Sequence, residues 1–329
     1  MGTMRGVNKM GIKDKYQDYF EIGVAVNNRT IRTHSELIKK HFNSLTFENE
    51  SKFSSLQKSE GKYKFKKLDE LVSFGRENKM SMRGHTFTWH QQTPNWVFKN
   101  ATKEILLERL KSHIEVVGKR YEDDFYCWDV VNEAIDDKGD GILRKSFWTD
   151  IIGQDFMEYA FHYAREVLPS TELFYNDYNE SLLPKRDKIY KTVKDMKDKG
   201  VPINGVGLQC HWNIYQPSMD EIRRAIEVYA DLGLRIHITE MDISVYRFED
   251  KQRLSKPTEK MLEQQAKVYG DSFAIFREYK DLIDNVTLWG PADDVTWLDN
   301  FPVRKRKNWP LLFDENQEPK EAYYRIMDF

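Results

Sequence analysis

The sequence is poor in cysteine: its 329 residues include only two, Cys127 and Cys210. A disulfide framework of the kind that holds small secreted domains together therefore does not define this fold. Both cysteines fall in runs predicted to be buried strands, so we expect two reduced thiols in the core. A disulfide between them stays open, because it depends on a backbone distance that folding decides.

The sequence also lacks an excess of either charge. Its 51 Lys and Arg residues nearly balance 53 Asp and Glu residues, and the net charge is -2. This gives no general electrostatic reason to expect nucleic acid or an anionic membrane as a partner. The basic run at residues 304–307 (RKRK) is only four residues long, and we interpret it as a solvated loop.

Long apolar stretches are missing as well. No run is long enough to cross a membrane, and the N-terminal residues lack the apolar core of a secretory signal peptide. The sequence therefore predicts a cytoplasmic protein without a membrane partner. A secreted protein whose leader has been removed would show the same pattern.

What the sequence does contain is a regular alternation of strand and helix patterns. Predicted strands span residues 20–26, 42–49, 81–89, 125–134, 173–179, 205–212, 235–244 and 286–293. Predicted helices span residues 30–41, 63–78, 102–121, 146–168, 186–199, 218–233, 258–284 and 318–328. Eight such units predict an α/β fold, a single (β/α)8 TIM barrel that fills residues 1–329 as one catalytic domain. An open doubly wound sheet is disfavoured, because no glycine-rich phosphate turn follows any strand.

Two of the predicted strands end in polar residues that a core would not select. The stretch 125–134 (FYCWDVVNEA) ends with Asp129, Asn132 and Glu133, and the stretch 235–244 (RIHITEMDIS) ends with Glu240 and Asp242. In a parallel barrel the active site lies at the C-terminal ends of the strands. The two strands therefore offer one glutamate each at the same rim.

Hydrogen-bonding residues also follow the other predicted strands, from the second to the eighth. Their recurrence at consecutive strand ends indicates a polar ligand with many contacts. In chain order these residues are Glu48, Asn49, Lys52, His85, Trp89, His90, Asn132, Glu133, Asn176, Asp177, Tyr178, Gln209, His211, Glu240, Asp242, Trp289 and Trp297.

A glutamate pair across a barrel mouth suits the cleavage of a glycosidic bond. One carboxylic acid protonates the leaving oxygen, and the second carboxylate attacks the anomeric carbon or activates water. A carboxylate separation of roughly 5–5.5 Å retains the configuration of the sugar, and one of roughly 6.5–9.5 Å inverts it. The sequence leaves this separation open.

Side chains alternate along a strand, so His211 shares a face with Gln209, and Glu240 shares one with Asp242. If these two faces meet, His211 lies between the two carboxylates. It would then orient Glu240 and favour its ionised form, as a nucleophile requires. Glu133 follows apolar valines and is the better candidate for a raised pKa, and therefore for the acid.

Seven stretches together carry a family resemblance: LTFENESK, RGHTFTWHQQTPNW, WDVVNEA, YNDYN, GVGLQCHW, ITEMDI and LWGPADDVTWL. In this order and spacing the sequence resembles glycoside hydrolase family 10, the retaining endo-β-1,4-xylanases, from about residue 20 to the C-terminus. The resemblance implies that Glu133 is the acid/base and Glu240 the nucleophile, with support from His211 and Asp242. It implies no cofactor and no metal.

The resemblance also implies which residues hold the substrate, xylan or a xylo-oligosaccharide. Sugars on the non-reducing side of the cut would be held by Glu48, Asn49, Lys52, His85, Trp89 and Gln92. The sugar whose bond breaks would contact Asn132 and Gln209 under a roof of Trp289 and Trp297, and Tyr178 would flank the leaving side. Xylose lacks the hydroxymethyl group of glucose, so a tight roof could reject glucose by a clash.

The missing leader, the lack of an appended polysaccharide-binding module and the long basic loop after Trp297 resemble the intracellular branch of this family. They predict action on imported short xylo-oligosaccharides. Barrels often form dimers, but no patch in the sequence identifies an interface, so a homodimer stays open.

Three other functions compete with this interpretation. A related retaining barrel glycosidase would act on β-glucans or β-galactosides, and oligomers of cellulose would reveal it. A metal-dependent barrel hydrolase is disfavoured, because the sequence has no His-Glu-x-x-His motif. A non-catalytic sugar-binding barrel would lack a catalytic glutamate, whereas Glu133 and Glu240 are both present.

Overall fold

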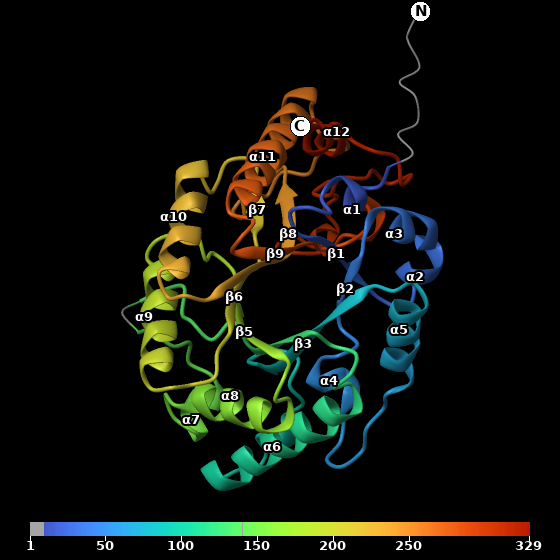
Figure 1. Cartoon of the computed structure of the whole chain (residues 1–329). Helices are drawn as coiled ribbons and strands as arrows, with labels where there is room; N and C mark the ends of the chain where they lie inside the picture. Colours follow the sequence, from blue (N-terminus) through green and yellow to red (C-terminus); the bar gives the residue numbers. More distant parts are fainter. Residues whose placement is uncertain (1–9, 140) are drawn as a thin grey trace, which may run out of the picture.

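The computed structural model describes residues 10–139 and 141–329. Eight parallel strands form a closed barrel with helices arranged around it (Figure 1). These strands are β1 (Glu21–Val26), β2 (Ser44–Phe47), β3 (Ser81–Trp89), β4 (Cys127–Asn132), β5 (Glu172–Asp177), β6 (Gly205–Leu208), β8 (Arg235–Ser244) and β9 (Ile283–Leu288). They pair in chain order, and the pairings β6–β8 and β1–β9 close the ring. The predicted single (β/α)8 barrel is confirmed.

The strand predicted over residues 205–212 is wrong in one respect, because it is interrupted. Cys210 has a left-handed φ of 56°, which extended backbone does not permit. The chain resumes as β7 (His211–Asn213), which pairs with the upper half of β8, so that His211 lies opposite Asp242. The interruption therefore sets Gln209 and His211 at separate points of the barrel rim.

The helices of the described chain alternate with the strands around the barrel (Figure 1). They are α1 (Ile12–Lys15), α2 (Thr30–Thr33), α3 (Ser35–His41), α4 (Phe53–Leu56), α5 (Lys66–Glu77), α6 (Lys103–Arg120), α7 (Phe147–Ile151), α8 (Phe156–Val167), α9 (Lys185–Asp198), α10 (Met219–Ala230), α11 (Glu259–Glu278) and α12 (Glu321–Met327). Within the described residues, no helix is both long enough and apolar enough to cross a membrane. The N-terminal segment predicted to lack the apolar core of a signal peptide includes residues 1–9, which lie outside the described residues.

Several predicted boundaries are wrong for identifiable local reasons. The helix predicted over 146–168 is divided into α7 and α8 near Gly153, whose φ of 115° no helix accommodates. The helix predicted over 30–41 is likewise divided into α2 and α3. The eighth strand begins three residues earlier than predicted and stops before Trp289, because Gly290 with a φ of 143° and then Pro291 follow.

The barrel interior contains a buried ion pair as well as apolar side chains. Arg83 on β3 pairs with Asp129 on β4, and an Nη of Arg83 lies 2.7 Å from Nδ1 of His237 on β8. Asp129 therefore lies inside the barrel, and its assignment to the strand end with Asn132 is wrong. Burial alone would raise the pKa of Asp129, but Arg83 and His85 lower it below its ordinary value.

The two cysteines are free thiols, as predicted. Both are fully buried, and Sγ of Cys127 accepts a hydrogen bond from Arg83 at 3.2 Å.

The interpretation of residues 304–307 as a solvated loop is wrong for Arg306, which is buried and donates to the backbone carbonyl of Asp250 at 2.5 Å.

Candidate active site

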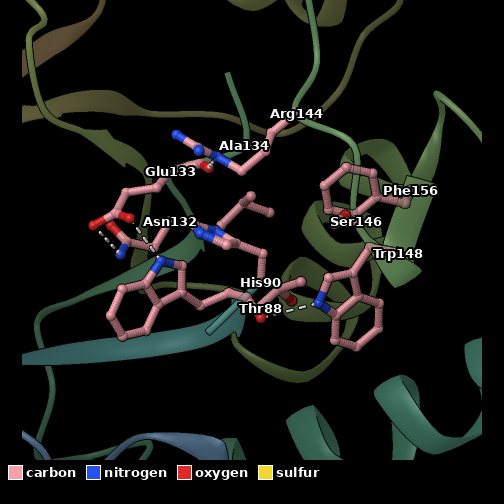
Figure 2. A pocket seen from close by; sticks show the side chains of 11 residues that line it. Thr88, His90, Asn132, Glu133, Ala134, Arg144, Ser146, Trp148 and Phe156 are labelled. Atoms are coloured by element: carbon pink, nitrogen blue, oxygen red, sulfur yellow. Dashed lines mark hydrogen bonds between the residues drawn. The ribbon is translucent and has the colours of Figure 1, made fainter. Parts of the chain in front are cut away.

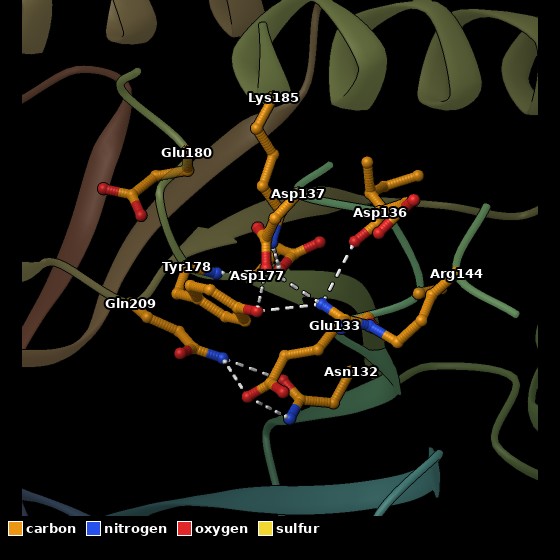
Figure 3. Close-up of polar contacts among 12 residues, drawn as sticks. Asn132, Glu133, Asp136, Asp137, Arg144, Asp177, Tyr178, Glu180, Lys185 and Gln209 are labelled. Carbon is orange, nitrogen blue, oxygen red and sulfur yellow. Dashed lines mark hydrogen bonds and ion pairs between the residues drawn. The ribbon is translucent and has the colours of Figure 1, made fainter. Parts of the chain in front are cut away.

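Glu133 directly follows β4 and has a left-handed φ of 55°. Its backbone N–H donates to the carbonyl of Asn176 on β5 at 2.9 Å, so the neighbouring strand stabilises this uncommon conformation. Trp89 Nε1 donates to the Glu133 carboxylate at 2.9 Å. Figure 2 shows Glu133 beside Asn132 in the pocket that both line. Gln209 Nε2 donates to the other carboxylate oxygen at 3.2 Å (Figure 3). Contacts from three strand ends thus fix the carboxyl group.

The pKa of Glu133 is raised above its ordinary value. Burial is the largest cause, and the negative charges of Asp177 and Glu240 act in the same direction. The hydrogen bonds from Trp89 and Gln209 lower the pKa but do not reverse the shift. The environment therefore favours the protonated carboxyl group, which is the form that a general acid needs.

Glu240 lies on β8 and has the opposite electrostatic surroundings. Asn176 Nδ2 donates to its Oε1 at 2.8 Å, His211 Nε2 lies 3.1 Å from its Oε2, and His85 Nε2 lies 3.9 Å from Oε1. Burial alone would raise the pKa of Glu240, but His211, His85 and Lys52 lower it below its ordinary value. The ionised form is therefore favoured, as a nucleophile requires.

His211 lies between two carboxylates, as predicted, although the pairing of β7 with β8 rather than side-chain alternation within one strand places it there. Its Nε2 is 3.1 Å from Glu240, and its Nδ1 is 3.0 Å from Asp242. Burial alone would lower the pKa of His211, but Asp242 and Glu240 raise it to about 10. His211 is therefore an imidazolium at neutral pH. Trp297 Nε1 donates to Asp242 at 2.8 Å and fixes the far end of this chain.

A chain of side-chain amides connects the two glutamates. Asn132 Oδ1 accepts from Asn176 at 2.9 Å and from Gln209 at 3.1 Å, while its Nδ2 donates to Glu133 at 3.2 Å. The amide group of Asn176 also reaches Glu240, as described above. The positions of both carboxylates are therefore coupled through three buried amides.

The residues after β2 form a second polar group at the mouth. Asn27 donates to the Glu48 carboxylate at 2.8 Å, and Gln92 Nε2 donates to Asn49 Oδ1 at 3.3 Å. Lys52 Nζ lies 3.5 Å from the same Asn49 oxygen. Such donors and acceptors suit the hydroxyl groups of a sugar.

Lys52 is buried, and its ammonium group lies 4.8 Å from the centroid of the Trp89 ring. Burial lowers the pKa of Lys52, although the charges of Glu240, Glu48 and Glu133 oppose this effect. Lys52 thus contributes a positive charge close to both glutamates.

Two tryptophans cover the histidines of the site. Trp289 lies edge-on to His85, with 5.6 Å between ring centroids, and its centroid is 6.1 Å from that of His211. Trp297 is closer to His211, at 5.0 Å. Both tryptophans line one hollow together with Glu48. The predicted aromatic roof therefore lies beside the predicted sugar-binding residues.

Tyr178 belongs to a cluster of charged residues beside Glu133 (Figure 3). Its hydroxyl donates to Asp137 and accepts from Arg144 at 2.8 Å. Lys185 is buried, forms ion pairs with Asp137 and Asp177 at 2.7 Å each, and lies 3.5 Å from the centroid of the Tyr178 ring. The cluster fixes the position of the Tyr178 ring, and the predicted role of this ring at the leaving side stays a prediction.

Sequence reasoning missed three residues of this site. Asn27 directly follows β1, but it was not recognised as a strand-end candidate. Arg144 lies in a loop and Lys185 at the start of α9, where no strand-end pattern identifies them. Asn176 does occupy a strand end, in YNDYN, but its contact with both Asn132 and Glu240 depends on barrel closure. Among the described residues, no group of three or more His, Cys, Asp or Glu side chains is placed to hold a metal ion.

The site as a whole can perform acid-assisted displacement. The surroundings of Glu133 raise its pKa and favour the protonated form, and those of Glu240 lower its pKa and favour the ionised form. An amide chain and His211 position the two carboxyl groups. Pairs of carboxyl groups with opposite pKa shifts are typical of enzymes that cleave glycosidic bonds.

Comparisons with known proteins agree with this geometry. The chain is 51% identical to the endo-1,4-beta-xylanase A of Caldicellulosiruptor saccharolyticus. The alignment extends over 328 residues and covers 97% of this chain and 96% of that protein. It is 50% identical over 323 residues to an endo-1,4-beta-xylanase of Geobacillus stearothermophilus, covering 96% and 98%. The crystal structure of an endo-1,4-beta-xylanase from Caldicellulosiruptor owensensis superimposes with a TM-score of 0.95 at 50% identity, covering 97% of this chain and 100% of that one. Residues 11–329 match Glycosyl hydrolase family 10, and the chain belongs to that family.

Proposed function

We propose that this protein is an endo-1,4-β-xylanase that retains the configuration of the sugar. The observation that carries the proposal is the opposite environment of the two glutamates, with the pKa of Glu133 raised and that of Glu240 lowered. The relatives described above, which bear the name endo-1,4-beta-xylanase, support xylan as the substrate.

In the first step, a Glu240 oxygen bonds to the anomeric carbon while the glycosidic C–O bond breaks. The leaving oxygen takes the proton of Glu133, which becomes a carboxylate. In the second step, that carboxylate takes a proton from water as the water oxygen bonds to the anomeric carbon. The bond to Glu240 breaks in the same step, both glutamates return to their starting states, and the two inversions give net retention.

Histidine and lysine charges keep Glu240 in the ionised form needed for attack and assist its departure in the second step. The imidazolium of His211 and the ammonium of Lys52 stabilise the Glu240 carboxylate before attack. They also favour its departure as a carboxylate in the second step. The roof formed by Trp289 and Trp297 would exclude the hydroxymethyl group of glucose, which xylose lacks.

Hydrolysis of xylotetraose, polymeric xylan and cellotetraose, run side by side, tests the proposal. We expect cleavage of the xylan substrates, with the newly formed reducing end in the β configuration in NMR spectra recorded before mutarotation. Faster cleavage of cellotetraose would favour the alternative of a β-glucan glycosidase. α-Configured first products would contradict retention, and binding without cleavage would favour a sugar-binding barrel.

The cytoplasmic location and the preference for short xylo-oligosaccharides stay predictions. Fractionation of the source cells, followed by assay of each fraction, checks the location. The ratio of activity on xylotetraose to activity on polymer checks the preference for chain length.

A further inference from the structure

The three residues after β4 donate all of their backbone N–H groups to β5. These residues are Glu133, Ala134 and Ile135. The Glu133 N–H donates to the Asn176 carbonyl at 2.9 Å. The N–H groups of Ala134 and Ile135 both donate to the hydroxyl oxygen of Tyr175, at 3.1 Å each. Because Tyr175 is fully buried, its hydroxyl group is a fixed acceptor for the segment that carries the acid.

A single residue, Arg144, binds the carbonyl groups of the same segment. Its Nε donates to the Glu133 carbonyl at 3.2 Å, and an Nη group donates to the Ile135 carbonyl at 3.4 Å. Its backbone N–H donates to the Ala134 carbonyl at 2.7 Å. The N–H and carbonyl groups of the segment therefore all have partners, and none is free to support a second arrangement. We call Tyr175 and Arg144 the backbone clamp.

Three charged side chains join the two halves of the backbone clamp. The Tyr175 hydroxyl donates its proton to Asp177. Lys185 is buried and forms ion pairs with Asp177 and Asp137, at 2.7 Å each. Asp137 in turn pairs with Arg144 at 3.3 Å (Figure 3). A movement of either half is thus resisted by the other.

The backbone clamp acts on the residue whose position controls proton transfer. Glu133 has a left-handed φ of 55°, which is unfavourable for a residue with a side chain and persists only where its surroundings enforce it. The Glu133 carboxyl group loses and regains a proton in each catalytic cycle, so the hydrogen bonds of that group change during the reaction. The backbone hydrogen bonds involve no group that changes its charge. They can therefore hold Glu133 in place throughout the cycle.

We propose that Tyr175 and Arg144 are positioning residues, which aim the Glu133 carboxyl group at the leaving oxygen by fixing the backbone behind it. The proposal rests on the proposed function and adds to it the residues that place the acid. Both residues act through the Glu133 backbone rather than on the reacting atoms. A displacement of a catalytic group by about 1 Å can lower a rate about 10²-fold, so a small shift of this segment is sufficient to impair proton transfer.

The test compares two aryl xylobiosides that differ in their need for an acid. Phenolate leaves slowly without a proton from Glu133, whereas dinitrophenolate leaves without one. In Tyr175→Phe we expect kcat/KM for the phenyl substrate to fall about tenfold, a part of the usual contribution of a general acid. The value for the dinitrophenyl substrate should stay near that of the wild type. Both substrates are assayed on one preparation, so the ratio of the two values does not depend on the folded fraction.

A second variant removes the other half of the backbone clamp. Arg144→Met frees the carbonyl groups of Glu133 and Ile135, and it should lower the phenyl-to-dinitrophenyl ratio in the same direction. Tyr16→Phe is the matched control. It removes another buried hydroxyl group, which donates to the Ile326 carbonyl on α12 at 2.6 Å, and it should leave both values unchanged.

An equal fall for both substrates in Tyr175→Phe would indicate a merely structural role and would overturn the proposal. An unchanged value for the phenyl substrate, or the same selective loss in Tyr16→Phe, would overturn it as well. If Tyr175→Phe does not fold, Arg144→Met decides by the same criterion. If the wild type cleaves neither xylan substrate, the proposed function fails and the positioning role fails with it. Xylan cleavage by the wild type, together with an unselective loss in the variants, contradicts the positioning role alone.

Discussion

At the scale of single residues, the site derives its chemistry from unequal surroundings of identical groups. Glu133 and Glu240 have the same carboxyl group, but carboxylates surround the first, and His211, His85 and Lys52 face the second. Burial raises the pKa of both, so the difference comes from neighbouring charges rather than from depth. The division of roles between acid and nucleophile follows from this difference.

Removal of either glutamate should abolish turnover of unactivated xylo-oligosaccharides. We expect Glu133→Ala to lower kcat on xylotetraose by about 10²–10⁴, the usual contribution of a general acid. Glu240→Ala should be inactive on every substrate, because no covalent intermediate forms. An aryl xylobioside with a nitrophenolate leaving group distinguishes the two variants. Nitrophenolate departs without a proton from Glu133, so Glu133→Ala should still form the covalent intermediate from this substrate, whereas Glu240→Ala should not.

Circular dichroism spectra should show that both variants keep the wild-type fold. Full activity in either variant on xylotetraose would contradict the assignment of that glutamate.

Replacement of His211 should move the acidic limb of the pH profile. The His211 imidazolium lowers the pKa of Glu240, so His211→Asn raises that pKa. Glu240 must be ionised to attack, and therefore the acidic limb of kcat/KM should shift to higher pH. The basic limb, set by the raised pKa of Glu133, should move little. A pH profile with an unchanged acidic limb would show that His211 does not control Glu240.

At the scale of secondary-structure elements, the ends of the strands matter more than their interiors. Periodicity places the strand interiors well, because alternating or continuous apolar runs specify a buried strand. The strand ends depend on single residues in left-handed conformations, such as Glu133 and Cys210. Glutamate and cysteine have no preference for a positive φ, so the sequence does not predict these conformations. Neighbouring strands stabilise them through hydrogen bonds such as the one from the Glu133 N–H to the Asn176 carbonyl. Sequence reasoning therefore found the strands and missed where several of them stop.

Close packing between β3 and β4 should make Gly84 sensitive to substitution. A Cβ at Gly84 would lie 2.1 Å from Cδ2 of Trp128, a fully buried indole with little room to move. We expect Gly84→Ala to lower the free energy of unfolding by about 1–3 kcal/mol, the usual result of overpacking. Urea denaturation measures it. Gly141→Ala is the matched control, because its Cβ meets its nearest atom only at 3.8 Å, and it should change stability by less than about 0.5 kcal/mol.

At the scale of the whole molecule, the closed barrel brings distant parts of the sequence into contact. Arg83 on β3 contacts His237 on β8, and these two residues are 154 positions apart in the chain. Arg83 also forms an ion pair with Asp129 on β4. Glu133 and Glu240 meet the same amide chain because β4, β5, β6 and β8 are consecutive neighbours in the barrel. Closure thus assembles both the interior ion pair and the site.

Loss of Arg83 should destabilise the barrel strongly. Arg83→Met leaves the Asp129 carboxylate buried without its main partner, and we expect a loss of about 3–5 kcal/mol at neutral pH. The pKa of Asp129 then rises, so the carboxyl group takes up a proton more readily, and the loss should shrink as the pH falls. Urea denaturation at several pH values measures both effects.

Arg32→Met is the control for this variant. The pair of Arg32 with Glu70 is exposed, and its loss should cost about 1 kcal/mol or less. A similar loss in both variants would show that the interior pair contributes no more than an exposed one.

The sequence by itself determined the eight strands of the barrel and their alternation with helices, the family resemblance and the positions of both glutamates at strand ends. It did so because apolar periodicity and strand-end chemistry are local patterns that the order of residues records directly. Only the tertiary structure decided which carboxyl group is neutral, where Asn176, Arg144 and Lys185 act, and that Asp129 belongs to the interior. These outcomes depend on distances between residues far apart in the chain. Burial and charge act through such distances, and barrel closure alone sets them.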